Sequence, residues 1–551
     1  MIAVVCSDSE REITREFFQL FKAPWEFCVK EREYDVVIST LHETPPVEAR
    51  LVVIYSSKPT QIDISREIAV ESAVARHLVG HDGTSIPIYG ELACFRVKGR
   101  ALPVHCRSGS EAVVIELPEP HGKILRVGYD LFDEIAFLLS HGQPVENALI
   151  PTLECHVALL RGWIVDGGIP VIEIPPIPWG RSFIVCLTHD IDFVGIRRHK
   201  LDRTMWGFIY RALVGSCLRF LRGTSSFDRL VRNWAAVFSL PLVYIGVLDD
   251  FWDHFEAYAE LEEGLYSTFF LIPFKDRAGD KVQGKDRARR ATRYDINDVR
   301  ARVQDLTLRG FEIGLHGIDA WHSIEKGTQE LERITRATGQ EQVGVRIHWL
   351  CFDRESHAAL EQAGFDYDAT FGYNETIGYK GGTSQVFKPF GATRLLELPL
   401  HIQDTSLFYP RRLGLSDSEA WELCEALLNS AIRFGGVVTV SWHERSLAPE
   451  RLWGEFYEHL LSELQARGAW FGTAGQVVQW FRERRSVTFE DCRFDGNTLR
   501  LRLKQTGDGS VPRWFLRVHR PRCDEFPGSR TQQTHMDVPW SGEPSVEIPL
   551  G

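Results

Sequence analysis

The sequence predicts an α/β protein whose central part is a barrel-like domain of parallel strands and crossover helices. Between 183 and about 482, short apolar runs alternate with helical patterns, as expected for strands joined by crossover helices. The runs are almost continuously apolar, which indicates strands buried on both faces. Polar clusters follow the runs, at the strand ends where barrels of this kind assemble active sites. The runs lie at 183–188, 267–272, 312–316, 344–347, 395–399 and 437–442.

Length and composition indicate a soluble globular protein with more than one domain. A chain of 551 residues corresponds to about three domains. Hydrophobic residues make up 44% and charged residues 25%, as in ordinary globular proteins. The net charge of -12 argues against a nucleic-acid surface and fits a neutral or cationic substrate better.

The compartment predicted from the sequence is the cytoplasm. The first residues carry no basic, apolar pattern of a secretory signal, and no segment reaches the roughly 20 apolar residues of a membrane span. Eleven cysteines are scattered mostly in apolar contexts without a C-x-x-C pair. We therefore expect reduced core cysteines rather than disulfides or a zinc knuckle.

A proline-rich stretch marks the first domain boundary. Pro170, Pro175, Pro176 and Pro178 lie close together, and proline neither continues a helix nor donates to a central ladder. We expect an N-terminal α+β domain at 1–175, the barrel-like domain at 176–484 and a C-terminal β domain at 485–551. The last contains β-type runs at 499–504 and 514–518, separated by a turn signal at 507–509.

A long insertion at 197–262 interrupts the barrel-like domain. Its apolar and aromatic residues with flanking arginines, above all at 203–222, are compatible with peripheral membrane contact or with a partner-binding helix. An amphipathic helix packed on the barrel has the same composition, and surface helices usually look like this. The polar stretch 275–293 is expected to form an exposed loop near the site.

Two carboxylates end the first apolar run. In Thr188-His189-Asp190-Ile191-Asp192 alternate side chains face the same way, so Asp190 and Asp192 can point into one pocket while Ile191 faces back. Two like charges so close cost free energy unless a cation or a proton lies between them. Solvated acids in a turn are the structural alternative, because Asp is common in turns.

Two histidines follow the third run, at His316 and His322. Neutral imidazole is a good ligand for borderline divalent metals, so both histidines with Asp192 would form a three-ligand site. Taken alone, either histidine fits a hydrogen-bonded structural role equally well. Their presence at strand ends together with an acid pair favours the metal site.

Later runs add an arginine, an acid and a histidine. Arg346 can hold a carboxylate in its ionised form through bidentate hydrogen bonds. His443 ends the last run, and a histidine made more basic by a carboxylate such as Asp404 is suited to protonate a leaving group. Asp404 as a loop cap and His443 bound to a carbonyl are the structural alternatives.

The order of these motifs resembles the NodB-type polysaccharide deacetylases, metal-dependent carbohydrate esterases with a distorted (β/α) barrel. The resemblance covers 183 to about 482. A further stretch at 364–374, with 377–379 and 387–390, is similar to the branch found among exopolysaccharide-biosynthesis proteins. The motifs are Thr188-His189-Asp190-Ile191-Asp192, Leu315-His316, Arg346-Ile347-His348-Trp349, Leu398-Pro399 with Asp404, and Val440-Ser441-Trp442-His443.

The resemblance implies the catalytic roles. Asp190 is the expected general base, and Arg346 is the group that steadies it. His443 is the expected general acid, supported by Asp404. Trp349 is expected to line the acyl pocket or to stack on the sugar, and Trp442 is expected to do the same.

The resemblance also implies a divalent metal, with zinc as the expected ion and with Asp192 and His316 as ligands. The second histidine of the family usually follows the first by four residues, but this chain has Ala320 there. His322 is the expected third ligand. The possible substitutes are His348, His401 or a water.

The expected function is metal-dependent hydrolysis of an N-acyl group, in the first place N-acetyl, on a sugar. The substrate would be a polysaccharide, an oligosaccharide or a lipid-linked glycan. An inactive carbohydrate-binding or scaffold protein of a polysaccharide-biosynthesis assembly is the main alternative, because of Ala320. An HD phosphohydrolase built on His189-Asp190 is the other, but that fold is all-helical and these motifs end β-type runs.

Overall fold

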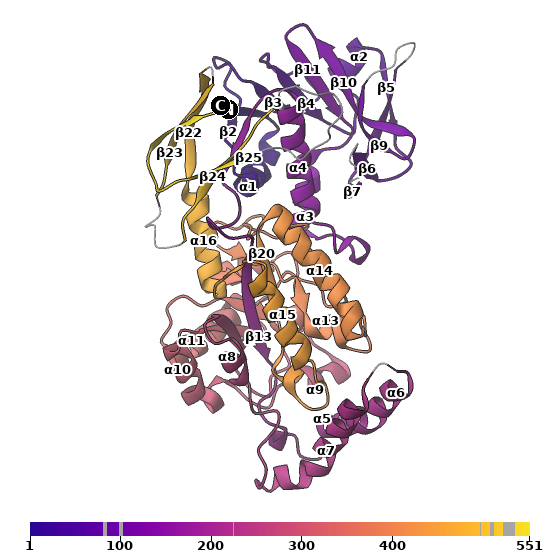
Figure 1. Cartoon of the computed structure of the whole chain (residues 1–551), viewed down its shortest axis with the longest axis vertical. Helices are drawn as coiled ribbons and strands as arrows, with labels where there is room; N and C mark the ends of the chain where they lie inside the picture. Colours follow the sequence, from indigo (N-terminus) through magenta and orange to yellow (C-terminus); the bar gives the residue numbers. More distant parts are fainter. Residues whose placement is uncertain are drawn as a thin grey trace. The chain divides into compact units, whose positions relative to one another are not determined.

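The computed structural model describes residues 1–80, 85–97, 103–223, 225–495, 497–506, 512–521 and 535–550. The chain forms two compact units (Figure 1). Unit 1 comprises Met1–Gly180, Gly381–Phe390 and Gln479–Gly551, and unit 2 comprises Arg181–Lys380 and Gly391–Val478. We expected the C-terminal segment to be a separate domain, whereas here it belongs to the same unit as the N-terminal segment. None of the helices in the described ranges is both long enough and apolar enough to cross a membrane.

Unit 1 contains a mixed sheet with the order β2-β1-β3-β4-β11-β10-β9-β6-β7. Its first part, up to β11, is parallel, and the remaining strands are antiparallel. The strands are β1 (Ile2–Val5), β2 (Trp25–Phe27), β3 (Val36–Ser39), β4 (Leu51–Tyr55), β6 (His77–Gly80), β7 (Ser85–Pro87), β9 (Val104–Ser108), β10 (Glu111–Glu119) and β11 (Gly122–Val127). The helices include α1 (Arg11–Phe21), α2 (Gln61–Ser65), α3 (Leu131–Ser140) and α4 (Thr152–Asp166), and β5 (Ile68–Ser72) pairs with β8 (Ala93–Val97).

The two β-type runs of the C-terminal segment lie in different sheets. β23 (Thr498–Lys504) pairs with β22 (Thr488–Asp495) and β26 (Ser545–Pro549). β24 (Phe515–His519) lies between β25 (His535–Pro539) and β12 (Val171–Glu173). The pairing of β12 with β24 joins the N-terminal segment of unit 1 to its C-terminal segment. The turn signal expected at 507–509 lies outside the described residues.

Unit 2 is built on a parallel sheet with the order β18-β17-β16-β15-β14-β13-β20-β19, and β21 also pairs with β13. Each of the six predicted apolar runs overlaps one of its strands. The strands are β13 (Ile184–Ile191), β14 (Ser267–Leu271), β15 (Glu312–Gly317), β16 (Val345–Ile347), β17 (Tyr367–Asp368), β18 (Leu396–Glu397), β19 (Ile402–Gln403), β20 (Val437–Ser441) and β21 (Trp470–Phe471). The helices include α8 (Ala257–Leu261), α9 (Arg287–Arg290), α10 (Arg300–Leu308), α11 (Ile324–Thr338), α12 (Ser356–Ala363), α13 (Asp404–Phe408), α14 (Asp417–Phe434) and α15 (Gly454–Ala466), and α16 (Ala474–Ser486) runs from this unit into unit 1.

The sheet of unit 2 curls, because its two edge strands follow each other in the chain. β18 and β19 are separated only by 398–401. In this link the N–H of Leu398 donates to the carbonyl oxygen of Asp368 at 2.8 Å, and the N–H of His401 donates to that of Thr439 at 3.1 Å. The link therefore bonds to both edges, which is compatible with a distorted barrel. The carboxyl ends of the strands consequently gather at one end of the sheet.

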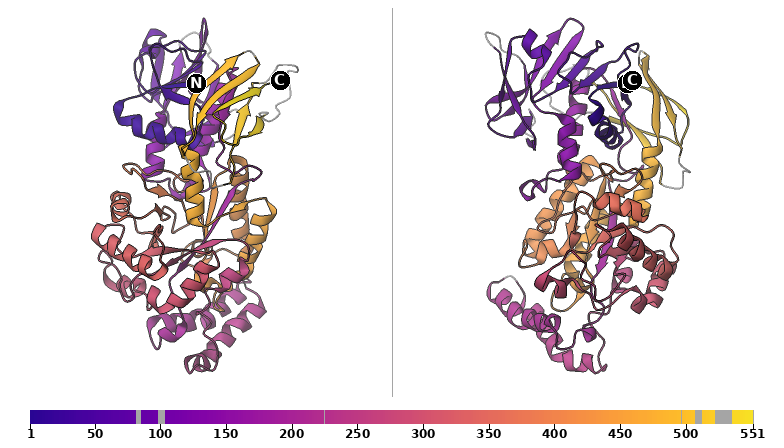
Figure 2. Two further views of the ribbon diagram at one scale, coloured as in Figure 1. Left: turned by 90° about the vertical axis from the view of Figure 1, so that its left-hand side faces the viewer. Right: turned by 180° about the vertical axis from the view of Figure 1, so that it is seen from behind.

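The insertion forms a helical hairpin, which consists of α5 (Arg203–Tyr210), a π-helical turn at Arg211–Gly215, α6 (Ser216–Leu221) and α7 (Phe227–Tyr244). Its inner side contacts Trp252 and Ala448 of unit 2 through a cluster of buried apolar side chains. Both views of Figure 2 show the hairpin projecting beyond the rest of unit 2. The predicted packing of a helix on the barrel is thus seen for the inner side of the hairpin, but not for its outer side.

Candidate active site and metal centre

The carboxyl ends of the strands of unit 2 line a cavity of about 210 Å³. Asp190, Asp192, His316, Trp349 and His443 all contribute to its wall, although they come from four separate parts of the chain. Curling of the sheet explains this convergence, because parallel strands deliver their carboxyl ends to the same edge. The cavity therefore assembles most of the residues that the sequence analysis selected.

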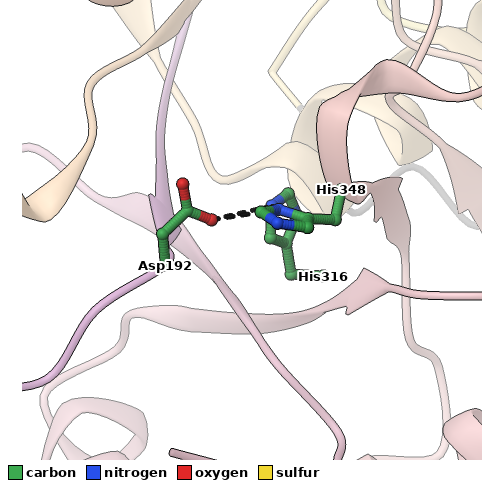
Figure 3. Close-up of side chains that lie close together, drawn as sticks. All are labelled: Asp192, His316 and His348. Carbon is green, nitrogen blue, oxygen red and sulfur yellow. Dashed lines mark hydrogen bonds and ion pairs between the residues drawn. The ribbon is translucent and has the colours of Figure 1, made fainter. Parts of the chain in front are cut away.

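Three donor atoms meet at one point of the cavity wall (Figure 3). Asp192 Oδ1 lies 3.3 Å from His316 Nε2 and 3.1 Å from His348 Nδ1, and the two nitrogens lie 2.8 Å apart. His316 Nδ1 lies 3.0 Å from the carbonyl oxygen of Arg346, to which it donates a hydrogen bond. That bond fixes the tautomer and leaves the Nε2 lone pair of His316 facing the other two donors.

The donor triangle fits a divalent metal. Ligand atoms on a tetrahedral zinc, at about 2.0–2.2 Å from the ion, are about 3.4 Å apart, close to the separations seen here. Asp192 Oδ1 is buried and accepts no hydrogen bond within the described part of the chain. A buried carboxylate oxygen beside two imidazole nitrogens needs a cation or a proton to offset their repulsion. Two histidines and one carboxylate also leave an open position, as catalytic zinc sites require.

Glu444 supports Asp192 from behind. Its Oε2 accepts a hydrogen bond of 2.9 Å from the backbone N–H of Asp192. Burial, and next the charge of Asp192, raises the pKa of Glu444 to about 8. Glu444 therefore holds the backbone of Asp192 without placing a second full negative charge next to it at neutral pH.

Asp190 is held by a buried arginine. Arg346 Nη1 lies 2.9 Å from Asp190 Oδ1 and 2.6 Å from Thr188 Oγ1, and Arg346 Nε donates to the carbonyl oxygen of Ala369 at 2.9 Å. Burial acts to raise the pKa of Asp190, but the charge of Arg346, followed by those of His316 and His443, lowers it overall. Asp190 is therefore an ionised carboxylate with a fixed orientation at the cavity wall.

His443 is paired with the fully buried Asp404. Its Nδ1 lies 2.6 Å from Asp404 Oδ1, and its backbone N–H donates to Asp404 Oδ2 at 2.8 Å. Burial alone would lower the pKa of His443, but Asp404, followed by Asp192 and Asp190, raises it to about 9. At neutral pH the imidazole is therefore protonated, with Nδ1 directed at Asp404.

His322, the expected third ligand, lies away from the donor triangle. Its Nε2 is 2.9 Å from Asp319 Oδ1, in the turn before α11. His348, one of the named substitutes, takes the position instead, because β15 and β16 pair with His316 opposite Arg346. His401, the other histidine substitute, accepts a hydrogen bond from the backbone N–H of Thr439 at its Nδ1.

The two tryptophans expected at the substrate differ in position. Trp349 lines the cavity and is 40% exposed. Trp442 is fully buried, with its ring 5.0 Å from that of Tyr457 and stacked on it. Neighbouring side chains at the end of β20 face opposite ways. Because the side chain of His443 faces the cavity, that of Trp442 faces the core. The expected substrate contact of Trp442 is not seen in this arrangement.

Further cavity residues come from loops that carry no periodic signal. Tyr409 and Arg412 follow α13, and Arg451 follows the 3₁₀ turn Glu444–Leu447. Asn374 belongs to the stretch that the sequence analysis used only for the resemblance. The order of motifs in the sequence does not identify these residues, because their positions depend on how the loops fold over the strand ends.

A second acid–histidine cluster lies in the core and does not line the cavity. His357 Nε2 is 3.1 Å from Glu397 Oε2 and 3.8 Å from Asp368 Oδ2. Burial raises the pKa of Glu397 to about 7, and burial together with the charge of Glu397 raises that of Asp368 well above its usual range. Backbone N–H groups of Phe371 and Thr370 donate to Glu397 and Asp368. The cluster thus shares protons and ties together the ends of β17 and β18.

The comparisons with known proteins give distant likenesses only. No protein-family model matches the chain, and no curated protein sequence matches it. Among solved structures, a candidate polysaccharide deacetylase from Mycobacterium smegmatis aligns over 58% of this chain and 99% of its own, at 18% identity and a TM-score of 0.33. A mutant of a CE4 family pseudoenzyme with restored enzymatic activity aligns over 54% and 67%, at 12% identity and a TM-score of 0.24. Both TM-scores are below 0.5, so the function must be argued from the cavity itself.

Proposed function

We propose that the cavity hydrolyses an N-acyl group, in the first place N-acetyl, from a sugar. One observation carries this proposal: the donor triangle of Asp192, His316 and His348 lies in the same cavity as an ionised carboxylate and a protonated imidazole. These are the groups that amide hydrolysis needs, namely a metal site, a base for water and an acid for the amine.

The base side of the reaction belongs to Asp190. A divalent ion on the donor triangle would supply Lewis acidity, which polarises an acyl carbonyl and lowers the pKa of water. Asp190 accepts the proton of the attacking water, because Arg346 keeps the carboxylate ionised and fixes its direction. Zinc is the expected ion, since it favours two imidazoles and one carboxylate.

The acid side belongs to His443. With Nδ1 held by Asp404, the proton to be transferred is on Nε2. His443 donates this proton to the amine nitrogen as the C–N bond breaks, so that the sugar leaves as a neutral amine. The acyl carbon keeps the oxygen of the water and leaves as a carboxylic acid, which is acetic acid for an N-acetyl sugar.

The inactive scaffold considered from the sequence depended on Ala320. In the folded chain His348 supplies the donor that position 320 lacks, which supports the enzyme over the scaffold. A role in exopolysaccharide biosynthesis, inferred from 364–374, and a cytoplasmic location remain part of the same proposal.

The test combines metal analysis with an acetate-release assay on N-acetylated oligosaccharides and lipid-linked sugars. We expect one divalent ion per chain and release of acetate that a chelator abolishes. A protein that binds no metal and releases no acetate from any of these substrates would be a scaffold instead.

A further inference from the structure

The helical hairpin of unit 2 carries an apolar surface on its outer side. Half of the large apolar side chains that are exposed in the described ranges fall within 206–248. On α7 and its C-cap they are Phe227, Val231, Trp234, Phe238, Leu242 and Ile245, with exposed fractions from 40% to 72%. On α5, the π-helical turn and α6 they are Trp206, Tyr210, Val214, Leu218 and Leu221. Successive members are three or four residues apart, which places each set along one helix face.

The outer face of α7 is not needed for packing on unit 2. The opposite face of this helix is already buried, through Asn233, Ala236, Leu240 and Val243. A helix of an isolated soluble domain has one apolar stripe, and a helix that is apolar on two sides is normally covered on both. The outer stripe therefore indicates a second apolar environment. Phe220 and Phe227, whose ring centroids are 6.0 Å apart, connect the stripes of the two helices.

The charge of the hairpin indicates which kind of apolar environment covers the outer stripe. Between 203 and 248 the chain has six arginines and a single aspartate, whereas the whole chain has a net charge of -12. Two of the six, Arg229 and Arg232, are in ion pairs with carboxylates. Arg203 and Arg222 are exposed. Local positive charge next to exposed Trp and Tyr rings is the pattern of helices that lie in the interface of an anionic membrane.

We propose that the outer face of the hairpin docks on the surface of a membrane that contains anionic phospholipids. The stripes enter the boundary between headgroups and acyl chains, and the exposed Arg203 and Arg222 contact lipid phosphates. The hairpin contacts Ala448, three residues before the cavity residue Arg451. Docking would therefore bring the cavity close to substrates anchored in the membrane.

The test is co-sedimentation of the full chain with vesicles. One set consists of phosphatidylcholine alone, and the other also contains phosphatidylglycerol. We expect binding to the anionic vesicles that weakens with salt, and about a tenfold loss of partitioning in Trp234→Ser/Phe238→Ser. Leu308→Ser is the matched control, because Leu308 is 88% exposed elsewhere on unit 2, and it should bind like the unchanged protein. The thermal unfolding midpoint of both variants checks that the fold is kept.

Three outcomes would overturn the membrane proposal. The first is absence of binding to either vesicle, and the second is binding that the double substitution leaves intact. The third is a stable dimer in analytical ultracentrifugation that the double substitution dissociates, since a second copy would then cover the stripes.

A different observation carries a second inference, on the substrate. Arg412 lines the cavity and is held only by neutral acceptors. Its Nη1 donates to Gln403 Oε1 and to Thr405 Oγ1, both at 2.9 Å, and its Nη2 donates to Asn374 Oδ1 at 3.2 Å. These contacts fix the guanidinium without neutralising its charge.

Arg451 is a second cavity arginine that forms no ion pair in the described ranges, and the carboxylate whose charge acts on it, Asp404, is already paired with His443. Its Nη1 is buried and has no hydrogen-bond acceptor in the described part of the chain. None of the carboxylates in the described ranges forms an ion pair with Arg412 or Arg451, whereas the neighbouring Arg445 is paired with Glu450. A fixed, unpaired guanidinium in a cavity is suited to bind an anion, because its donors match a carboxylate or a phosphate.

We infer that the sugar in the cavity carries an anionic group, a carboxylate or a phosphate, which Arg412 and Arg451 bind. The preference for acidic substrates in hydrolysis rests on the proposed function, whereas the binding of an anion to the two arginines does not. The overall charge of the chain favoured a neutral or cationic substrate, whereas the two arginines make the local preference anionic.

Two measurements test the anion subsite. In acetate release, we expect N-acetylated substrates with a uronic acid or a sugar phosphate to be preferred over neutral ones. Arg412→Gln should reduce that preference in kcat/KM about tenfold, while the exposed neighbour variant Arg411→Gln keeps it. Comparison of the uronic acid substrate with the sugar phosphate substrate shows whether the anionic group is a carboxylate or a phosphate.

The second measurement does not depend on activity. Inorganic phosphate and glucuronate, titrated separately, should each bind to the full chain and lose affinity about tenfold in Arg412→Gln. Equal hydrolysis of neutral and acidic substrates, or anion binding that Arg412→Gln leaves unchanged, would overturn the subsite. Anion binding that depends on Arg412, in a protein that releases no acetate, would keep the subsite and refute the proposed function.

Discussion

His348 Nδ1 lies 2.8 Å from His316 Nε2, so the two imidazoles that complete the donor triangle come from neighbouring parallel strands. The chain lacks a histidine four residues after His316, where Ala320 stands. The third donor is thus supplied across the sheet, by the residue that directly follows β16. This arrangement places both candidate donors at strand ends, with His316 inside the β15–β16 ladder and His348 directly after it.

Removal of His348 should remove the metal. We expect His348→Ala to weaken zinc affinity by at least about 100-fold, because a ligand contributes more than the outer partners whose loss costs about 10- to 100-fold. Competition with a colorimetric chelator measures the affinity. His322→Ala is the matched control, since His322 pairs with Asp319 and should leave the affinity unchanged. The reverse result, with zinc lost only in His322→Ala, would contradict the geometry.

Neutralising Asp190 should stop the reaction without releasing the metal. Asp190→Asn keeps the side-chain volume but removes the base, so we expect kcat to fall by about 10²- to 10⁴-fold. Metal content measured on the same preparation should stay near that of the unchanged protein. Asp192→Ala provides the contrast, since it should lose metal and activity together. Full activity in Asp190→Asn would show that another group takes the proton of the water.

The sequence predicted those parts of the site that depend on local pattern. Asp190 and Asp192 were selected because two acids one residue apart at a strand end must face the same side. The placement of Arg346 beside Asp190 came only from the resemblance, and the structure brings the two within 2.9 Å.

Residues that depend on register or on loop folding were not predictable in this way. His348 and His322 both follow strands, and only the pairing of β15 with β16 decides which one reaches His316. Trp442 and His443 are neighbours, and the strand's orientation decides which of them faces the cavity. Arg412 has no pattern at all in the sequence around it.

Loss of the core acid–histidine cluster should reduce stability without affecting the metal. Glu397→Ala leaves the backbone N–H of Phe371 and the ring of His357 without their acceptor, at a cost of about 2–4 kcal/mol in the free energy of unfolding. Urea unfolding followed by tryptophan fluorescence measures this change. Glu375→Ala, at an exposed position close by, should stay within about 0.5 kcal/mol of the unchanged protein. If Glu397→Ala lost zinc while keeping its stability, the cluster would be a metal site instead of a structural one.

The pH dependence of hydrolysis should report the pairing of His443 with Asp404. Because the carboxylates raise the pKa of His443 to about 9 against the effect of burial, the imidazole keeps its proton throughout the neutral range. A general acid is active only in its protonated form, so kcat/KM should fall as the pH rises through the pKa of His443. A bound divalent ion offsets the charge of Asp192, one of the carboxylates that raise this pKa, and therefore places the fall below pH 9. Asp404→Asn removes the first of these carboxylates, and the alkaline limb should then shift toward lower pH. The profile is measured with the zinc-loaded protein, in buffers of equal ionic strength. An alkaline limb that stays in place in Asp404→Asn would assign it to a group other than His443.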